Sequence, residues 1–321
     1  MNTIAVLTSG GDAPGMNAAI RAIVRAGIEK GMRVMGVRRG YNGLMHGDIF
    51  EMTLRSVSNI IERGGTILYT ARCPEFRTEE GVQKALNTCK YLGIDGLVVI
   101  GGDGSFRGAK VLSEHGLPTV GIPGTIDNDI ACCDHTIGYD TAMNTIVEMV
   151  DRLRDTSESH DRCSVIEVMG RHAGYLALNG GIAVGATSVL IPEFEYDFER
   201  DVIDRMRRTQ RTGKKNFVVV AAEGIKDEIE PMAKIIEEAT GVETRYTNLG
   251  HVQRGGSPTA YDRVLGSKMG HRAVELLSQD IGNRVVAQKD GKIVDFDIFE
   301  ALSMHKTIEE HEYKLAYDIS I

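Results

Sequence analysis

The sequence predicts an α/β fold made of two doubly wound, parallel-sheet lobes. Short apolar runs rich in β-branched residues alternate along the chain with segments of helical periodicity. Many of these runs are continuously apolar, which is typical of strands buried on both faces of a parallel sheet. The length of 321 residues exceeds the usual size of a single hydrophobic core. We therefore expect two lobes rather than one.

The individual elements follow from these patterns. The predicted strands are, in chain order, Thr3–Thr8, Arg33–Val37, Gly96–Ile100, Thr119–Ile122, Ser164–Met169, Ser188–Ile191 and Phe217–Ala222. Amphipathic segments between them predict helices that include Met16–Lys30, Glu79–Leu92 and Thr141–Asp155. The cationic segment Arg208–Lys215, which also contains Thr and Gly, is a predicted solvated loop. Neither a fixed-period repeat nor a long linker marks the boundary between the lobes.

Composition excludes several classes of protein. The chain is 42% hydrophobic and 26% charged, as in ordinary globular proteins, and no apolar stretch is long enough to cross a membrane. Its net charge of -8 disfavours nucleic acid as a partner. The first residues lack the features of a secretory signal, so we expect a cytoplasmic protein. The five cysteines form no CxxC pair, which favours reduced thiols over disulfides or a zinc site.

Four predicted strands end in loops of unusual composition: Ser9–Gly15, Gly101–Ser105, Pro123–Asp129 and Gly170–Gly174. The carboxyl ends of strands in an open parallel sheet face one crevice, so these loops should converge. In the first loop, glycines between a strand and a helix let backbone N–H groups approach an anion. A tight turn that simply needs glycine explains one such loop equally well. No Gly-Lys-Ser/Thr follows, so the loop is not a Walker motif.

Carboxylates and arginines complete the set of candidate residues. Glycines surround Asp103, which suits a site for phosphates and a hard cation such as Mg²⁺. Asp127 and Asp129 would lie on the same side of an extended segment, where one could accept a hydroxyl proton. Turn formation is the alternative role for these acids. Phosphoryl transfer also needs fixed positive charge, for which the candidates are Arg72, Arg162 and Arg171.

Taken together, these loops resemble those of the bacterial ATP-dependent 6-phosphofructokinase family. The motifs are Leu7–Asn17, Gly101–Ser105, Pro123–Asp129, Met169–Arg171 and Gly250–Gly256, and the resemblance covers essentially the whole chain. It implies two Rossmann-like lobes with the active site in the cleft between them. It also implies a larger, ATP-binding lobe of residues 1–138 plus 251–301 and a smaller, sugar-phosphate-binding lobe of residues 139–250 plus 302–321.

The resemblance implies Mg²⁺-dependent transfer from ATP to the 1-hydroxyl of fructose 6-phosphate, a step of glycolysis. Asp127 would be the general base and Asp103 the Mg²⁺ ligand, with Thr125, Arg171, Gly11 and Arg72 assisting the transferred group. Residues on the ATP side would be Gly11, Arg72, Cys73, Gly102, Asp103, Gly104 and Ser105. Residues that meet the sugar phosphate would be Thr125, Ile126, Asp127, Asp129, Arg162, Met169, Gly170, Arg171, Glu223, Arg245, His251 and Arg254. Asp129 could hold either sugar or metal.

Family members of this length are usually homotetramers, in which Arg162 and Arg245 would reach a neighbouring subunit's site. A second anion site, for ADP or phosphoenolpyruvate as allosteric effector, would use Arg21, Arg25, Arg55, Asn59, Arg154, Gly185, Thr187, Arg211, Lys214 and Lys215. Most relatives carry Glu at the position of Thr187, where it helps to hold the effector's Mg²⁺. This departure predicts altered or weak activation by nucleotide.

The donor and the reaction class each have alternatives. Pyrophosphate-dependent relatives usually carry Asp at the position of Gly104 and Lys at that of Gly124, so the two glycines favour ATP. A different kinase, acting on NAD or a lipid, would account for the Gly101–Ser105 loop alone. A nucleotide-sensing protein without catalysis is the other alternative, although Asp103, Thr125, Asp127 and Arg171 are all present.

Overall fold

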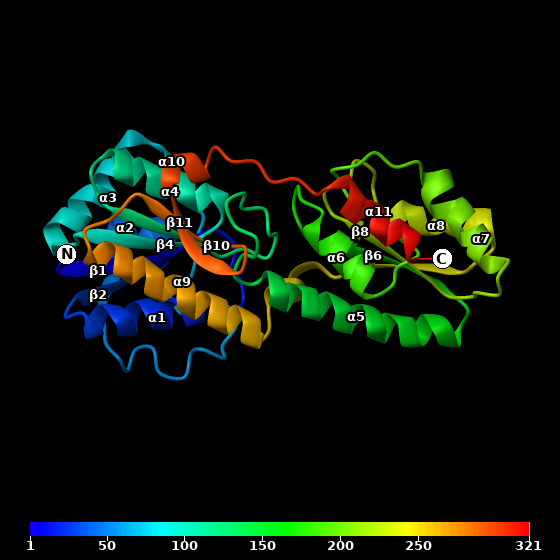
Figure 1. Ribbon diagram of the computed structural model, residues 1–321, viewed down its shortest axis with the longest axis horizontal. Helices are drawn as coiled ribbons and strands as arrows, with labels where there is room; N and C mark the ends of the chain where they lie inside the picture. Colours follow the sequence, from blue (N-terminus) through cyan, green and yellow to red (C-terminus); the bar gives the residue numbers. More distant parts are fainter. Residues whose placement is uncertain (321) are drawn as a thin grey trace. The chain divides into compact units, whose positions relative to one another are not determined.

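A computed structural model describes residues 1–320 of the chain, which divide into two compact units. Unit 1 contains residues 1–126, 130–141 and 254–306, and unit 2 contains residues 127–129, 142–253 and 307–320. The long helix α5 (Tyr139–Ser159) begins in unit 1 and continues into unit 2. Each unit has its own sheet (Figure 1).

Unit 1 is built on a seven-stranded sheet of order β11-β10-β5-β4-β1-β2-β3. Its strands are β1 (Thr3–Thr8), β2 (Arg33–Val37), β3 (Ile49–Met52), β4 (Gly96–Gly101), β5 (Thr119–Pro123), β10 (Arg284–Lys289) and β11 (Lys292–Asp297). The central strands β1, β4 and β5 are buried along their whole length and pair in parallel. Only the two edge pairs, β2 with β3 and β10 with β11, are antiparallel.

Helices cover both faces of this sheet. The helices of unit 1 are α1 (Met16–Glu29), α2 (Gly40–His46), α3 (Glu79–Leu92), α4 (Asp103–Glu114), α9 (Ala260–Ser278) and α10 (Ile298–Ala301). Figure 1 shows α1 and α9 along one face and α3 and α4 on the other. This division follows from right-handed crossovers, because the chain leaves β1 and β4 in opposite directions across the sheet.

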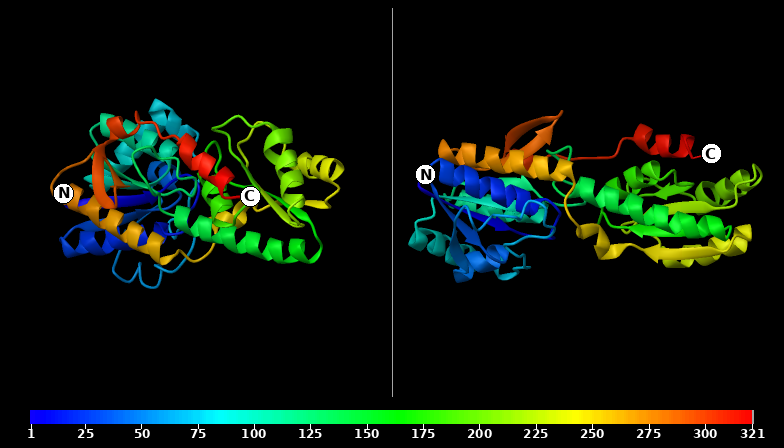
Figure 2. Two further views of the ribbon diagram at one scale, coloured as in Figure 1. Left: turned by 45° about the vertical axis from the view of Figure 1, so that its right-hand side comes forward. Right: turned by 90° about the horizontal axis from the view of Figure 1, so that it is seen from below.

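Close packing of α9 on α1 depends on two glycines. A Cβ atom at Gly266 would lie 2.9 Å from the carbonyl oxygen of Gly15, and one at Gly270 would lie 2.6 Å from that of Ala19. Any larger side chain would therefore push the two helices apart. The two helices run side by side in both views of Figure 2. The N-terminus of α9 is thus fixed beside the loop that precedes α1.

Unit 2 has a four-stranded parallel sheet of order β7-β8-β6-β9. Its strands are β6 (Cys163–Val168), β7 (Ser188–Leu190), β8 (Phe217–Ala222) and β9 (Thr244–Asn248). Its helices, besides most of α5, are α6 (Tyr175–Ala183), α7 (Asp204–Gln210), α8 (Glu230–Thr240) and α11 (Glu310–Asp318). The C-terminal helix α11 packs on α6 and β7, and Tyr313 Oη donates to the Val189 carbonyl at 3.0 Å.

The predicted α/β class and mainly parallel sheets are confirmed. The predicted strands agree with β1, β2, β4, β5, β6, β7 and β8 to within one residue at each end. Helix α3 was predicted from Glu79 to Leu92 and has those bounds, because Thr78 caps its N-terminus and Gly93 ends it with φ +64°. The predicted helix Thr141–Asp155 is part of the longer α5. The predicted loop from Arg208 was wrong at its start, since α7 continues to Gln210.

Within residues 1–320, every helix is too short or too polar to span a bilayer.

Candidate functional site

Three loops of unit 1 follow adjacent parallel strands and are joined through their backbones. Ser9 N donates to Ile100 O at 2.9 Å, and Gly124 N donates to Gly101 O at 3.0 Å. A Cβ atom at Gly101 would lie 2.4 Å from Ser9 O, so only glycine fits between these loops. The loops Ser9–Gly15 and Gly101–Ser105 and the segment Pro123–Ile126 therefore form one continuous edge, as predicted from their place after parallel strands.

Two helices begin at this edge and present their N-termini to it. Gly15, with φ +106°, precedes α1, and Gly102 precedes α4. Glycine leaves each N-terminus uncovered by a capping side chain, although Met16 N, Ala18 N and Ser105 N donate to Ala13 O, Gly15 O and Gly102 O within these turns. Helix dipoles and such N–H groups favour anions. This part of unit 1 can bind phosphate groups.

Asp103 is the first residue of α4 and is partly exposed. Its Oδ2 pairs with Arg107 Nε one turn later, at 2.8 Å. Among residues 1–320, no three His, Cys, Asp or Glu side chains gather as an all-protein metal site. Mg²⁺ characteristically uses one or two carboxylates together with water and substrate phosphates. A lone carboxylate beside a phosphate-binding edge fits that mode of binding.

Arg254 approaches the first loop from the segment that precedes α9. Its Nη1 donates to Asp12 O at 3.4 Å, and a Cβ at Gly11 would lie 2.4 Å from the same nitrogen. The loop that carries Arg72 and Cys73 is joined to the first loop by Thr70 Oγ1, which donates to Gly10 O at 2.6 Å. The structure thus brings these predicted residues to the edge where α1 and α4 begin.

The segment after β5 is only partly as predicted. Thr125 is buried, and its backbone is held by the chain just before α5: Thr125 N donates to Ile137 O at 3.1 Å, and Thr136 Oγ1 donates to Thr125 O at 2.6 Å. Beyond it the chain bends, and Asn128 has φ +53°. The expected extended segment is therefore absent, and spacing alone does not place Asp127 and Asp129 on one side. Asp127 is buried and Asp129 is exposed.

In unit 2, three loops follow the neighbouring strands β6, β8 and β9. The loop after β6 carries Met169, Gly170 and Arg171, and Arg171 N donates to Glu223 Oε1 at 2.7 Å. Arg171 has φ +59°, which turns the chain sharply at this point. The fully buried Gln253 accepts a hydrogen bond from Met169 N at 3.1 Å through its Oε1. These contacts link all three loops.

Gln253 was not predicted as a site residue. It lies inside the Gly250–Gly256 motif, and its side-chain amide also donates to Gly250 O at 3.0 Å. It therefore fixes the short helical turn that carries the exposed His251. A buried glutamine between two loops needs hydrogen-bond partners. Sequence alone gave no sign of which partners it would find.

Two further arginines of unit 2 share one carboxylate. Arg162 Nε lies 2.9 Å from Glu243 Oε2, and Arg245 pairs with the other oxygen of the same group. The hydrogen bond from Arg162 and the charges of both arginines hold the pKa of Glu243 below its usual value. Both residues lie at the start of adjacent strands, Arg162 just before β6 and Arg245 in β9. Their shared position supports grouping them as one cationic patch.

The predicted effector residues fall into two groups. In unit 2, Lys214 Nζ lies 3.5 Å from the hydroxyl of the buried Thr187, and Arg154 donates to Val184 O. Burial lowers the pKa of Lys214, and the charge of Arg154 adds to this. Gly185 lies beside these residues in sequence, Arg211 and Lys215 are exposed, and Lys215 pairs with Asp161 at 3.4 Å. In unit 1 the group comprises Arg21 and Arg25 on α1, with Arg55 and Asn59 in the loop after β3.

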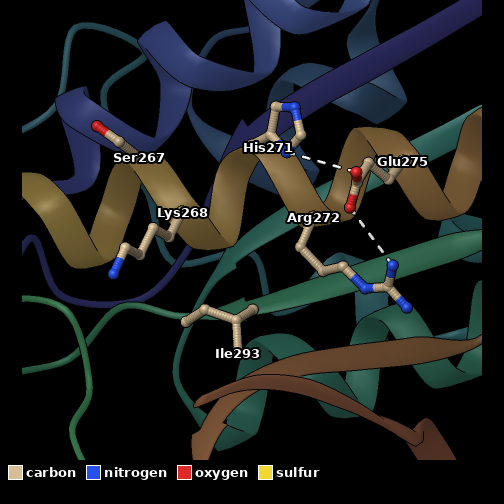
Figure 3. A pocket seen from close by; sticks show the side chains of 6 residues that line it. All are labelled: Ser267, Lys268, His271, Arg272, Glu275 and Ile293. Atoms are coloured by element: carbon tan, nitrogen blue, oxygen red, sulfur yellow. Dashed lines mark hydrogen bonds and ion pairs between the residues drawn. The ribbon is translucent and has the colours of Figure 1, made fainter. Parts of the chain in front are cut away.

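A shallow hollow of about 480 Å³ lies on another part of unit 1, between α9 and β11. Figure 3 shows Lys268, His271, Arg272 and Glu275 around it. Glu275 pairs with Arg272 at 3.4 Å and with His271 at 3.8 Å, and Arg272 also pairs with Asp295. The charges of Arg272 and Glu275 offset one another, and Lys268 adds a positive charge to the lining of the hollow.

Comparison with known proteins agrees with the resemblance. The phosphofructokinase family matches residues 3–277. The ATP-dependent 6-phosphofructokinase of Clostridium botulinum is 58% identical over 320 residues, and that of Alkaliphilus metalliredigens is 57% identical over 321, with 100% of each chain covered. The structure of phosphofructokinase from Saccharomyces cerevisiae superposes with a TM-score of 0.90 at 36% identity, over 100% of this chain and 48% of the yeast chain. The chain therefore belongs to the phosphofructokinase family.

Proposed function

We propose that this protein is an ATP-dependent 6-phosphofructokinase, which transfers the γ-phosphoryl group of ATP to the 1-hydroxyl of fructose 6-phosphate in glycolysis, in the cytoplasm. The observation that carries the proposal is the edge of unit 1, where α1 and α4 begin beside Asp103 and Thr125. Identity of 58% over the full length of a curated enzyme with this activity supports the same assignment.

Unit 1 binds the nucleotide in this proposal. The N–H groups at the start of α1 and α4 hold the phosphates, with Gly11, Arg72, Cys73 and Gly102–Ser105 around them. Asp103 would hold Mg²⁺, which would supply positive charge that offsets the negative charge of the phosphoryl oxygens. Thr125 and Arg171 bind the transferred group as its charge develops.

Asp127 accepts the proton of the sugar 1-hydroxyl. As the proton leaves, the hydroxyl oxygen forms a bond to the γ-phosphorus, and the bond from that phosphorus to the β–γ bridging oxygen breaks to release ADP. Burial of Asp127 limits access of water to this carboxylate. The products are fructose 1,6-bisphosphate and ADP.

Unit 2 binds the sugar phosphate in the same proposal. Its residues are Met169, Gly170, Arg171, Glu223 and His251, from the loops after β6, β8 and β9, and Asp129. The proposal adds Thr125, Ile126 and Arg254, which belong to unit 1. The cationic patch of Arg162 and Arg245 serves the sugar phosphate of a neighbouring subunit in a homotetramer. Arginine suits this role because its planar donors match phosphate oxygens.

The proposed effector site binds ADP or phosphoenolpyruvate through its cations. Lys214 and Arg154 lie beside Thr187, where a hydroxyl takes the place of the carboxylate usual in the family. We therefore expect weak activation by ADP. Changing Thr187 to Glu should increase the activation measured in an ADP titration at subsaturating sugar phosphate, because a metal ligand is restored. Strong ADP activation of the unchanged protein through this site would contradict the expectation.

A direct assay tests the proposed function. The purified protein is incubated with Mg²⁺, fructose 6-phosphate and either ATP or pyrophosphate, and the products are identified by mass spectrometry. We expect fructose 1,6-bisphosphate and ADP in equal amounts with ATP, and no comparable rate with pyrophosphate. Phosphorylation of NAD or of a lipid, with none of the sugar phosphate, would establish a different kinase.

A further inference from the structure

Asp262 is a fully buried carboxylate that the proposed reaction does not use. It lies in the first turn of α9 and accepts hydrogen bonds from the start of α5. Gly138 N donates to its Oδ1 at 2.9 Å, and Thr141 donates to its Oδ2 from both N, at 2.8 Å, and Oγ1, at 2.5 Å. Asp262 therefore caps the N-terminus of a helix other than its own.

The residue that caps α9, Thr259, also forms hydrogen bonds with the start of α5. Thr259 caps α9 by accepting from Asp262 N at 3.3 Å. The same Thr259 donates from Oγ1 to Asp140 Oδ2 at 2.5 Å and from N to Thr141 Oγ1 at 3.1 Å. Hydrogen bonds among Asp140, Thr141, Thr259 and Asp262 thus join the first turns of α5 and α9. We call these four residues the lock.

This lock is one residue away from the backbone that holds Thr125. Ile137 precedes Gly138, and it forms a parallel bridge with Gly124. Ile137 N donates to Pro123 O at 3.0 Å, and Ile137 O accepts from Thr125 N at 3.1 Å. A shift of Gly138 would therefore be passed to Thr125 through a short run of hydrogen bonds.

The lock also packs against the first anion-binding loop. Gly138 has φ +102°, and a Cβ atom there would lie 2.6 Å from Ala13 Cβ. A Cβ atom at Gly15 would lie 2.7 Å from Ile137 Cγ2 and 3.3 Å from Asp262 Cβ. Because these contacts leave no room for adjustment, movement of the α5 start would disturb the Ser9–Gly15 loop of the proposed phosphate site.

The chemistry of Asp262 indicates a role other than stabilisation. The charged group that faces it, Asp140, has the same sign, and the carboxylate is held by neutral donors. Burying a carboxylate without a cation is costly, even when it is fully hydrogen-bonded. Two carboxylate oxygens do, however, fix the direction of three donors at once, which a neutral side chain at this position would not do.

We propose that Asp262 is a positioning residue for phosphoryl transfer. By fixing the start of α5, it holds the Thr125 backbone and the Ser9–Gly15 loop in the positions that the transfer requires. The inference rests on the proposed function, since Thr125 is assigned there to the transferred group. Positioning errors of about 1 Å in such groups reduce turnover by on the order of 100-fold.

The test compares Asp262→Asn with the wild type. The amide keeps the shape of the carboxylate but turns an N–H donor toward the donors of Gly138 or Thr141. We expect kcat to fall by roughly 10- to 100-fold, with the KM values for ATP and fructose 6-phosphate changed by less than about threefold. The matched control is Asp295→Asn, which removes a carboxylate that pairs with Arg272 and Arg284 in the same unit.

A second readout is independent of activity. Hydrogen–deuterium exchange of peptides covering residues 124–141 should be faster in Asp262→Asn and unchanged in Asp295→Asn. If kcat and exchange in Asp262→Asn match the control, the inference is overturned. If the wild type itself leaves fructose 6-phosphate unreacted, the proposed function fails, and the exchange data still decide whether Asp262 fixes this segment.

A conservative pair covers the case in which Asp262→Asn does not fold. Thr141→Val removes the hydroxyl that donates to Asp262 and accepts from Thr259 N, whereas Thr141→Ser keeps it. We expect a lower kcat and faster exchange for the valine variant, and values near wild type for the serine variant. Equal kcat in the two variants would overturn the inference as well.

Discussion

Gly104 and Gly124 both belong to the proposed nucleotide-binding edge, but the space around them differs. A Cβ atom at Gly104 would meet nothing within 4 Å. One at Gly124 would lie 3.0 Å from both Ile100 Cγ2 and Met16 Cε. At the scale of single residues, Gly104 therefore leaves open space for a ligand, whereas a side chain at position 124 would press on Ile100 and Met16.

Substitutions at these glycines should separate donor binding from stability. Gly104→Asp should lower kcat/KM for ATP by more than about tenfold, because a carboxylate would repel the phosphates at the start of α4. Its melting temperature should stay near that of the wild type. Gly124→Lys should instead destabilise the fold by about 1–3 kcal/mol, because it overpacks Met16 and Ile100. Unchanged ATP kinetics in Gly104→Asp, or equal melting temperatures of the two variants, would contradict this interpretation.

At the scale of elements, the lock between α5 and α9 should be visible in the pH dependence of stability. Burial raises the pKa of Asp262 to about 6. The folded state then binds this proton more tightly than the unfolded chain, whose aspartates titrate near pH 4. Stability from this group is therefore complete below about pH 4 and declines as the pH rises through about 6. At neutral pH the carboxylate is ionised, as its positioning role requires.

We expect the difference in unfolding free energy between the wild type and Asp262→Asn to shrink by about 2–3 kcal/mol between pH 4 and pH 7. Urea unfolding at several pH values measures it. Asp295→Asn should show the opposite trend: burial raises the pKa of Asp295, but hydrogen bonds from Arg272 and Arg284 outweigh this and lower it overall. Its contribution is present above its unfolded pKa and is lost as the pH falls. Parallel trends in the two variants would contradict these assignments.

The elements also show what the sequence can predict. The strands β1, β4 and β8 are continuous apolar runs buried on both faces, and such runs are predicted well. The strands β3, β9, β10 and β11 were not predicted. Three of them, β3, β9 and β11, lie at sheet edges, where partial exposure permits polar residues and weakens the pattern, whereas β10 lies between β5 and β11.

The glycine-rich part of the site could be predicted from the sequence, whereas its long-range contacts could not. Glycine-rich loops after predicted strands indicated the edge around Gly11, Asp103 and Thr125, because parallel strands bring their carboxyl ends together. The lock made by Asp262 could not be predicted, since it joins residues more than 120 positions apart through side-chain hydrogen bonds. The left-handed conformation of Asn128 agrees with the turn that the sequence left open as the alternative for this segment.

At the scale of the whole molecule, the proposed activity depends on residues of a neighbouring subunit. Arg162 and Arg245 share Glu243 in this chain, although the proposal gives them to another subunit's sugar phosphate. Such an arrangement makes activity depend on assembly. It can be tested with two inactive variants.

Asp127→Ser and Arg162→Ser should each be nearly inactive alone. When the two are unfolded together and refolded as mixed tetramers, activity should recover well above the sum of the parents. A subunit with intact Asp127 would then receive Arg162 from a neighbour that carries the other change. Separately refolded and then mixed variants are the control. If co-refolding gives no recovery while mixed tetramers are detected by native mass spectrometry, Arg162 acts within its own subunit.

The most direct measurement is single-turnover transfer from γ-labelled ATP to fructose 6-phosphate in the wild type and in Asp127→Ser, with binding of both substrates measured separately. A base that acts in the transition state predicts a rate constant lower by on the order of 10²- to 10⁴-fold in the variant, with substrate affinities nearly unchanged. A variant that transfers the phosphoryl group as fast as the wild type would contradict the role of Asp127, and with it the proposed mechanism.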